Sequence, residues 1–265
     1  MKIKEIYDFL NTVAPYETQC PWDNSGLMTG SLEGETESIM LCLDCTNDVI
    51  EQAAANNCKV IISHHPMIFS GLKAVESDTP VYNAIKNDIT VISAHTNLDM
   101  AEGGVNDVLC EKLGIKNVQK LFAEGVPLMR MGDVKEISAK DFALFCSEKL
   151  SGNISSDFPS FAENRRNCIK LFDSGKPVKR VAVCGGAGGD LVAEAFCAGC
   201  DTFVTGEAKH HEYLEAKRLG INLIVAGHFS TEVPVLRALR DKLLREFPKH
   251  AVCVAYEESP YITVV

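Results

Sequence analysis

The sequence predicts an α/β protein built as two three-layer α/β domains, whose mixed, mainly parallel sheets are flanked by helices. The first reason is that short, β-branched apolar runs alternate along the chain with segments of helical apolar spacing. The second is that these runs are apolar almost throughout, which is typical of strands with both faces covered. With 265 residues, 46% of them hydrophobic, the chain is long enough for one or two such cores.

Each expected element follows from one of these two patterns. Apolar residues at helical spacing predict a first helix near the N-terminus, at Ile3, Ile6, Leu10 and Val13. The apolar runs predict strands at 38–44, 59–63, 89–94, 180–184, 201–205, 223–227 and 251–256. The segments between them predict helices that include 46–57, 189–199 and 231–247.

One stretch interrupts the alternation. Residues 125–136, GVPLMRMGDVKE, fit neither pattern and form the best internal boundary, and the polar residues 155–167 are interpreted as a surface loop. We therefore expect a discontinuous first domain, residues 1–124 with 226–265, and a second domain of residues 125–225.

Composition limits the compartment and the partners. The formal net charge is −10, and so acidic a surface repels phosphate backbones, which argues against a nucleic-acid partner. No apolar run approaches the roughly 18 residues that span a bilayer, and Glu5 and Asp8 interrupt any signal peptide. Most of the eleven cysteines lie inside apolar runs, as buried thiols do in a reducing compartment. We expect a cytoplasmic protein with no membrane partner.

The histidines are the most informative residues. Six of the seven lie in four short segments, each directly after an apolar strand: IISHHP, ISAHTNLD, VTGEAKHHE and VAGHFSTE. In open α/β sheets ligands bind outside the carboxyl ends of the strands, so these segments can converge. Two of them share a pattern, His95-x-x-x-Asp99 and His228-x-x-x-Glu232, which indicates that both serve one site.

The residue types in these segments indicate a metal centre. Imidazole nitrogens and carboxylate oxygens without a thiolate suit zinc, iron, manganese, cobalt or nickel. Five or six such ligands exceed the needs of one tetrahedral ion, whereas two divalent ions about 3.5–4 Å apart would use them all. Such pairs occur in hydrolases that activate a water molecule.

Each segment also has an explanation without metal. His64 and His65 would face opposite ways on a continuing strand, although Pro66 ends the strand there. The segment 228–232 could instead cap a helix, and Asp99 alone would be an ordinary loop acid. A solvated helix end is the alternative for the remaining pair, His210 and His211.

The glycine-rich segment 184–190, CGGAGGD, lies between an expected strand and an expected helix, where a phosphate could bind. It lacks the Lys-Ser/Thr of a P-loop and the spacing of a dinucleotide-binding turn. We favour a tight turn, at Gly185–Gly189, that lets strand and helix pack closely; a phosphate-bearing ligand is the alternative.

Six motifs in order carry a resemblance to a known family: PWDNSGL, ISHHPMIF, AHTNLDMAEGGVND, RVAVCGGAG, TGEAKHHE and AGHFSTE. From Trp22 to the C-terminus the chain resembles the Nif-three-like family, whose bacterial members are named GTP cyclohydrolase I type 2 homologues. The resemblance implies two α/β domains, a homo-oligomer in the form of a hexameric ring, and two divalent metal ions per chain. The implied metal ligands are His64, His65, Asp99, His228 and Glu232.

The same resemblance implies a metal-dependent hydrolase that acts on a nucleotide or related small molecule through metal-activated water. His95 is not among the implied ligands, so we expect it either to support a ligand or to act in catalysis, as a proton carrier beside the metal. The alternative is a non-catalytic ring that handles metal or serves as an interaction scaffold.

Overall fold

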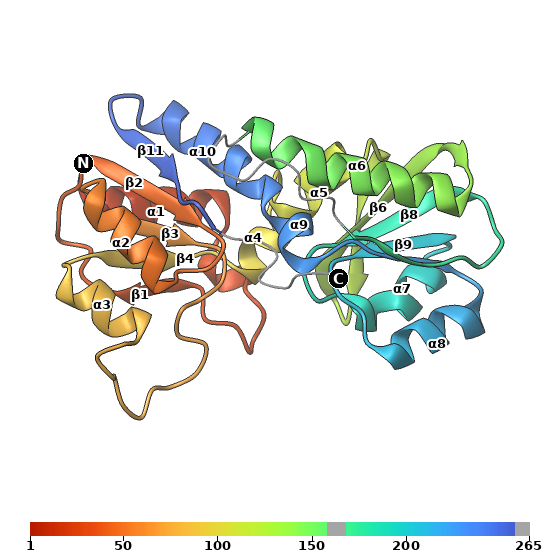
Figure 1. Cartoon of the computed structure of the whole chain (residues 1–265), viewed down its shortest axis with the longest axis horizontal. Coiled ribbons are helices and arrows are strands. Elements are labelled where there is room, and N and C mark those ends of the chain that lie inside the picture. The colour runs from red at the N-terminus through yellow and green to blue at the C-terminus, as the bar shows by residue number, and fades with distance from the viewer. Residues whose placement is uncertain (158–167, 258–265) are drawn as a thin grey trace. The chain divides into compact units, whose positions relative to one another are not determined.

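The computed structural model describes residues 1–157 and 168–257 of the chain. These residues form two compact units, the first made of residues 1–104 with 236–257 and the second of residues 105–157 with 168–235. Each unit has its own sheet flanked by helices, which confirms the predicted α/β class (Figure 1). Among the described residues, no helix is long and apolar enough to cross a membrane.

The first unit is built on a five-stranded sheet. Its strands are β1 (Gly26–Thr29), β2 (Ser38–Cys42), β3 (Val60–Ser63), β4 (Thr90–Ser93) and β11 (Ala251–Val254). Their order is β1-β4-β3-β2-β11; the last four are parallel to one another, and β1 pairs antiparallel with β4. The carboxyl ends of β2, β3 and β4 therefore lie side by side at one end of the sheet.

The helices of the first unit flank this sheet. They are α1 (Ile3–Val13), α2 (Asn47–Ala55), α3 (Pro80–Lys86), α4 (Thr96–Met100) and most of α10 (Pro234–Glu246). α2 begins where the Thr46 hydroxyl accepts a hydrogen bond from the backbone N–H of Val49, at 3.3 Å. Val49 and Ile50 of that helix then pack with Ile61 of β3 in a buried apolar cluster.

The second unit is built on a six-stranded sheet. Its strands are β5 (Lys116–Ala123), β6 (Val126–Ile137), β7 (Lys170–Phe172), β8 (Val178–Cys184), β9 (Thr202–Thr205) and β10 (Asn222–Val225). Their order is β5-β6-β8-β9-β10-β7, with a parallel centre, β8-β9-β10, and antiparallel strands on both sides of it. The helices are α5 (Val105–Lys112), α6 (Ala139–Asp157), α7 (Val192–Cys197), α8 (His210–Leu219) and α9 (His228–Glu232).

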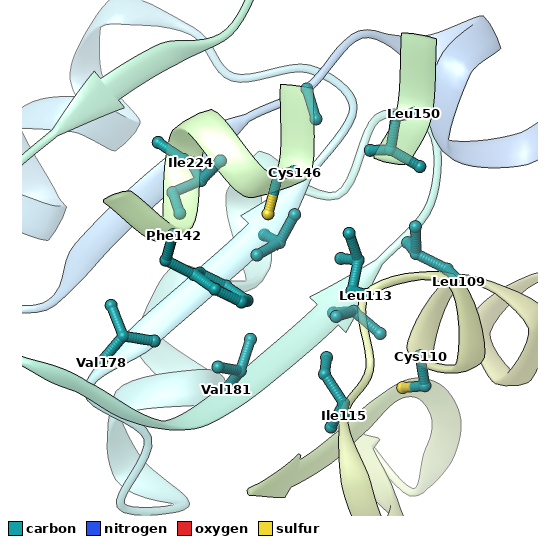
Figure 2. Packing of buried hydrophobic residues seen from close by; sticks show 14 of the residues in the cluster. Leu109, Cys110, Leu113, Ile115, Phe142, Cys146, Leu150, Val178, Val181 and Ile224 are labelled. Atoms are coloured by element: carbon teal, nitrogen blue, oxygen red, sulfur yellow. The ribbon is translucent and has the colours of Figure 1, made fainter. Parts of the chain in front are cut away.

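Apolar side chains cover both faces of this second sheet. On one face, Phe142 and Cys146 of α6 pack against Val178 and Val181 of β8 and against Ile224 of β10 (Figure 2). On the other face, side chains of α7 and α8 pack around β9. The central strands are buried on both sides, which is why their sequences are apolar at nearly every position.

All seven expected strands are present, but the expected boundary at 125–136 is a strand. That stretch is β6, which pairs with both β5 and β8. It looked irregular because its side chains are only partly buried and because it contains the buried Arg130, whose guanidinium pairs with Asp107. Residues 155–157 belong to α6, and residues 158–167 of the expected polar loop lie outside the described residues.

The unit boundaries also differ from the expected ones. They fall after residues 104 and 235, where the sequence predicted 124 and 225. The reason is that β5 pairs with β6, and that α9 packs on α5 and α6, so both β5 and α9 join the second unit. The helix expected at 231–247 is divided into α9 and α10, and Pro234 stands at the start of α10.

Candidate metal centre

The first unit brings four of the predicted site residues together at the carboxyl ends of β3 and β4. His64 and His65 directly follow β3, His95 follows β4, and Asp99 lies on α4. The centroids of the His64 and His65 rings are 4.9 Å apart, and the His95 ring lies 5.3 and 5.6 Å from them. Each of the three histidines offers a nitrogen within 4.8 Å of the others, so the group could hold a metal ion.

The backbone fixes the His64 ring in one tautomer. His64 is 2% exposed, and its Nδ1 lies 2.9 Å from the carbonyl oxygen of Ala94. A carbonyl oxygen can only accept, so Nδ1 carries the proton and Nε2 carries the lone pair. Nε2 lies 3.6 Å from Oδ1 of Asp99.

Carboxylates hold the two neighbouring rings in the same way. The Nδ1 atoms of His65 and His95 lie 2.8 Å from Oδ1 of Asp44 and of Asp23, respectively. Burial alone would raise the pKa of Asp23, but hydrogen bonds from His95 and Thr96 outweigh burial and keep that pKa well below its usual value. Asp23 is therefore an ionised acceptor, and His95 donates to it through Nδ1.

The second unit holds the other two predicted ligands on α9. His228 and Glu232 are four residues apart and so share one face of the helix, with His228 Nε2 3.2 Å from Glu232 Oε2. His228 Nδ1 lies 2.8 Å from Oε1 of Glu207, which follows β9. Glu232 is only 4% exposed, and a carboxylate so buried needs a cation or several hydrogen-bond donors.

The glycine-rich loop after β8 packs against this pair. The backbone N–H groups of Gly185, Gly186 and Gly188 donate to Asn106, Thr231 and Thr205, at 2.8, 3.0 and 3.1 Å. Because those groups bond within the protein, the loop fits the favoured tight turn better than a phosphate cradle. A Cβ atom at Gly186 would collide with Glu232 Oε1 and lie 3.2 Å from His228 Nε2, so only glycine leaves room for both side chains.

The remaining histidine pair lies outside both groups. His210 and His211 begin α8 and are exposed, and the nearest charged partner of His211 is Glu212, at 3.7 Å. Among the described residues, neither belongs to a group of side chains that could hold a metal ion. This is the arrangement of a solvated helix end.

The spacing of the candidate ligand atoms fits a divalent cation. Two ligands of one tetrahedral ion, each bound at about 2.0–2.2 Å, lie roughly 3.3–3.6 Å apart. The pair His64 and Asp99 is separated by 3.6 Å, and the pair His228 and Glu232 by 3.2 Å. Each ring also presents Nε2 in its metal-binding form, with Nδ1 held by an oxygen as is usual for metal-bound histidines.

Sequence reasoning missed the side chains that orient these rings. Asp44 is the last residue of the expected strand 38–44 and could have been found by the same strand-end argument as the histidines. Glu207 was noted in its segment but not paired with His228. Asp23 lies in the motif PWDNSGL, but nothing in the sequence paired it with His95, because the two residues are 72 positions apart.

Comparison with known proteins gives consistent results. The family described as Duf34/NIF3 (NGG1p interacting factor 3) matches residues 1–261. A protein of Campylobacter jejuni named GTP cyclohydrolase 1 type 2 homolog is 34% identical over 268 residues, covering 98% of this chain and 99% of its own length. One of the same name from Clostridium perfringens is 30% identical over 266 residues, covering 98% and 97%.

A solved structure has the same fold. It is titled Staphylococcus aureus hypothetical protein SA1388 and superposes with a TM-score of 0.87 at 26% identity, covering 100% of this chain and 99% of that one.

Proposed function

This chain belongs to the Duf34/NIF3 family, and from that membership we propose that it binds two divalent metal ions and acts as a metal-dependent hydrolase. The proposed metal ligands are His64, His65, Asp99, His228 and Glu232. The observation that carries the proposal is the fixed tautomer of the histidines. In all three ligand rings an oxygen acceptor lies at Nδ1, which leaves the lone pair on Nε2.

Ordinary structural roles account less well for this arrangement. A histidine at a surface or in a core needs no carboxylate at Nδ1. The three ligand rings are held at Nδ1 by two carboxylates and one carbonyl oxygen, and such acceptors are the usual support of metal-bound histidines. The ligand types suit zinc, iron, manganese, cobalt or nickel.

The space beside His65 supports a small-molecule substrate. An open depression of about 450 Å³ lies there, lined among others by Asp44, Thr46, Asn47, His65, Pro66 and Met67. Ligand pockets commonly have volumes of about 300–1,000 Å³. The name shared by the relatives, GTP cyclohydrolase 1 type 2 homolog, supports a nucleotide or a related small molecule.

In the proposed reaction the chain's own residues orient the ligands and carry a proton. Divalent ions in such a site would lower the pKa of water and stabilise developing negative charge. His95 would carry the proton, and Asp23 would hold its ring in one orientation during the transfer.

One observation favours the alternative, a non-catalytic ring that handles metal or serves as a scaffold. The His95 ring lies among the candidate ligands and is held at Nδ1 like them. Catalytic sites keep a position open for water, whereas closed sites hold the ion with protein ligands alone. If His95 is itself a ligand, storage is the better reading of the site.

A metal-reconstituted activity screen separates these functions. Metal-free protein is loaded in turn with each candidate ion and assayed against nucleotides, phosphoesters and peptides, with Glu232→Ala as the blank. Turnover that needs added metal and is absent in the blank supports the hydrolase. Two bound ions that exchange readily without any turnover support metal handling, and binding of fewer than two ions contradicts the proposed centre.

The assembly and the compartment are part of the same proposal. We propose a homo-oligomer, a hexamer, in the cytoplasm. The family resemblance supports the hexamer, and the absence of a spanning helix among the described residues is compatible with the cytoplasm.

A further inference from the structure

Two exposed aromatic side chains lie beside the candidate ligands of the first unit. Trp22 is 59% exposed and Phe69 is 53% exposed. Their rings are stacked, with 5.9 Å between centroids and 22° between planes. Each ring also lies 6.0 Å from the His95 ring, at 72° to it. The planes of Trp22 and Phe69 are therefore nearly parallel to each other, and both are steeply inclined to the plane of the His95 ring.

Hydrogen bonds hold both aromatic loops in place. Asp23, the neighbour of Trp22, accepts from His95 Nδ1 at 2.8 Å and from the backbone N–H of Thr96 at 3.0 Å. Asn24 Nδ2 donates to the carbonyl oxygen of Ile68, the neighbour of Phe69, at 2.7 Å. These bonds anchor the backbone next to each ring, although neither ring is buried. Rings held in this way lose little entropy when a ligand binds.

The geometry of the pair favours a flat partner. Aromatic rings prefer offset-parallel or edge-to-face neighbours, and two nearly parallel exposed rings offer flat faces on which a third ring can extend the stack. His95 connects this surface to the metal ligands, because its ring lies 5.3 Å from His64 and 5.6 Å from His65. A ring stacked parallel to the pair would be steeply inclined to the His95 ring.

We infer that Trp22 and Phe69 form a stacking platform that binds the planar nitrogen heterocycle of the substrate, a purine-type ring, beside the candidate metal ligands. The inference rests on the proposed function, because it names the ligand class of that same site. A sugar or a phosphate alone gains little from two flat rings, whereas base–aromatic stacking is a major contributor wherever proteins bind unpaired bases.

The single tryptophan of the chain provides a direct measurement. Stacking of a heterocycle on Trp22 should quench its fluorescence in a saturable way. Guanosine 5′-monophosphate is titrated into metal-free and into metal-loaded protein, with ribose 5-phosphate as the ligand that lacks the ring. We expect quenching by the nucleotide in both forms, and none by ribose 5-phosphate at the same concentrations.

Variants then locate the platform. Phe69→Ala should weaken nucleotide binding about 10-fold, the size of one lost stacking contact. Trp22→Ala should weaken it at least as much by calorimetry, and Trp22→Phe, which keeps a ring, should restore most of it. Ile85→Ala, which truncates an exposed apolar side chain on α3, is the matched control and should leave affinity unchanged. All four variants should bind as much metal as the wild type.

The outcomes separate this inference from the proposed function. If the protein binds two metal ions but the nucleotide causes no saturable quenching, the stacking platform is wrong and the metal centre is still supported. Quenching without metal binding supports the platform and contradicts the metal centre. If Trp22→Ala reduces the oligomer size in light scattering while nucleotide affinity is unchanged, the pair is an interface between copies of the chain and the inference is wrong.

Discussion

The replacement of Gly186 by alanine tests whether His228 and Glu232 bind metal where the structure places them. The added Cβ would collide with Glu232 Oε1, so the carboxylate must move by roughly 1 Å, beyond the ~0.5 Å tolerance of a well-built site. Residues that support a metal ligand typically contribute about 10- to 100-fold in affinity. We therefore expect Gly186→Ala to lose at least about 10-fold in affinity for one ion, close to 1.4 kcal/mol.

The backbone effect of the substitution needs its own control. Gly186 has φ +64°, where any L-residue costs about 1–2 kcal/mol. Gly114 has φ +66° in the same unit and nothing within 4 Å of its added Cβ, so Gly114→Ala carries the same strain without the collision. When metal is absent, Gly114→Ala should lower the unfolding temperature through backbone strain alone, and Gly186→Ala should lower it at least as much, because the collision adds to the same strain.

Calorimetric titration of the chelated proteins with a divalent ion gives the result. Gly114→Ala should bind metal like the wild type, and Gly186→Ala should bind one ion more weakly. Wild-type affinity in a folded Gly186→Ala protein would refute the reasoning, because it would mean that the position of Glu232 does not matter for binding.

Three further predictions concern the ligands, a buried acid and the assembly. Glu232→Ala and Asp99→Ala should each lose at least one of the two metal equivalents in elemental analysis, whereas His95→Ala should keep both and lose about 10- to 100-fold in activity or affinity. The reverse result, a lost equivalent in His95→Ala and none in Asp99→Ala, would make His95 the ligand. Burial raises the pKa of Glu257 to about 7 from 4.5, although the backbone N–H groups of Asp44 and Leu43 bond to its carboxylate. The folded protein then keeps this proton to higher pH than the unfolded chain, so stability falls as pH rises from about 4.5 to about 7, by up to about 3 kcal/mol. Urea unfolding of chelated protein should show that fall relative to Glu257→Gln, and parallel pH profiles of the two proteins would contradict it. Light scattering at micromolar concentration should give a hexamer, and a monomer would end that proposal.

The apolar pattern of the sequence predicted the strands correctly wherever a strand is buried on both faces. The runs at β2, β3, β4, β8, β9 and β10 were predictable because both sides of each strand need apolar residues. The missed strand β5 is largely exposed, so polar residues occupy it and no period appears. In β6, Arg130 is 1% exposed, which is possible only because Asp107, 23 residues earlier, supplies the countercharge.

The sequence by itself determined the class of fold, the chemical types of the ligands and their place after strand ends, since residue type and local periodicity are properties of short segments. Only the tertiary structure showed which oxygen accepts a hydrogen bond from Nδ1 of each histidine ring. Asp23 reaches His95 over 72 residues, Asp44 reaches His65 over 21, and Glu207 reaches His228 over 21. A hydrogen bond at Nδ1 sets the tautomer, and so the nitrogen that can bind metal, only when folding brings an acceptor to within about 3 Å. The same is true of the stacked pair Trp22 and Phe69, because nothing local to either residue indicates the other.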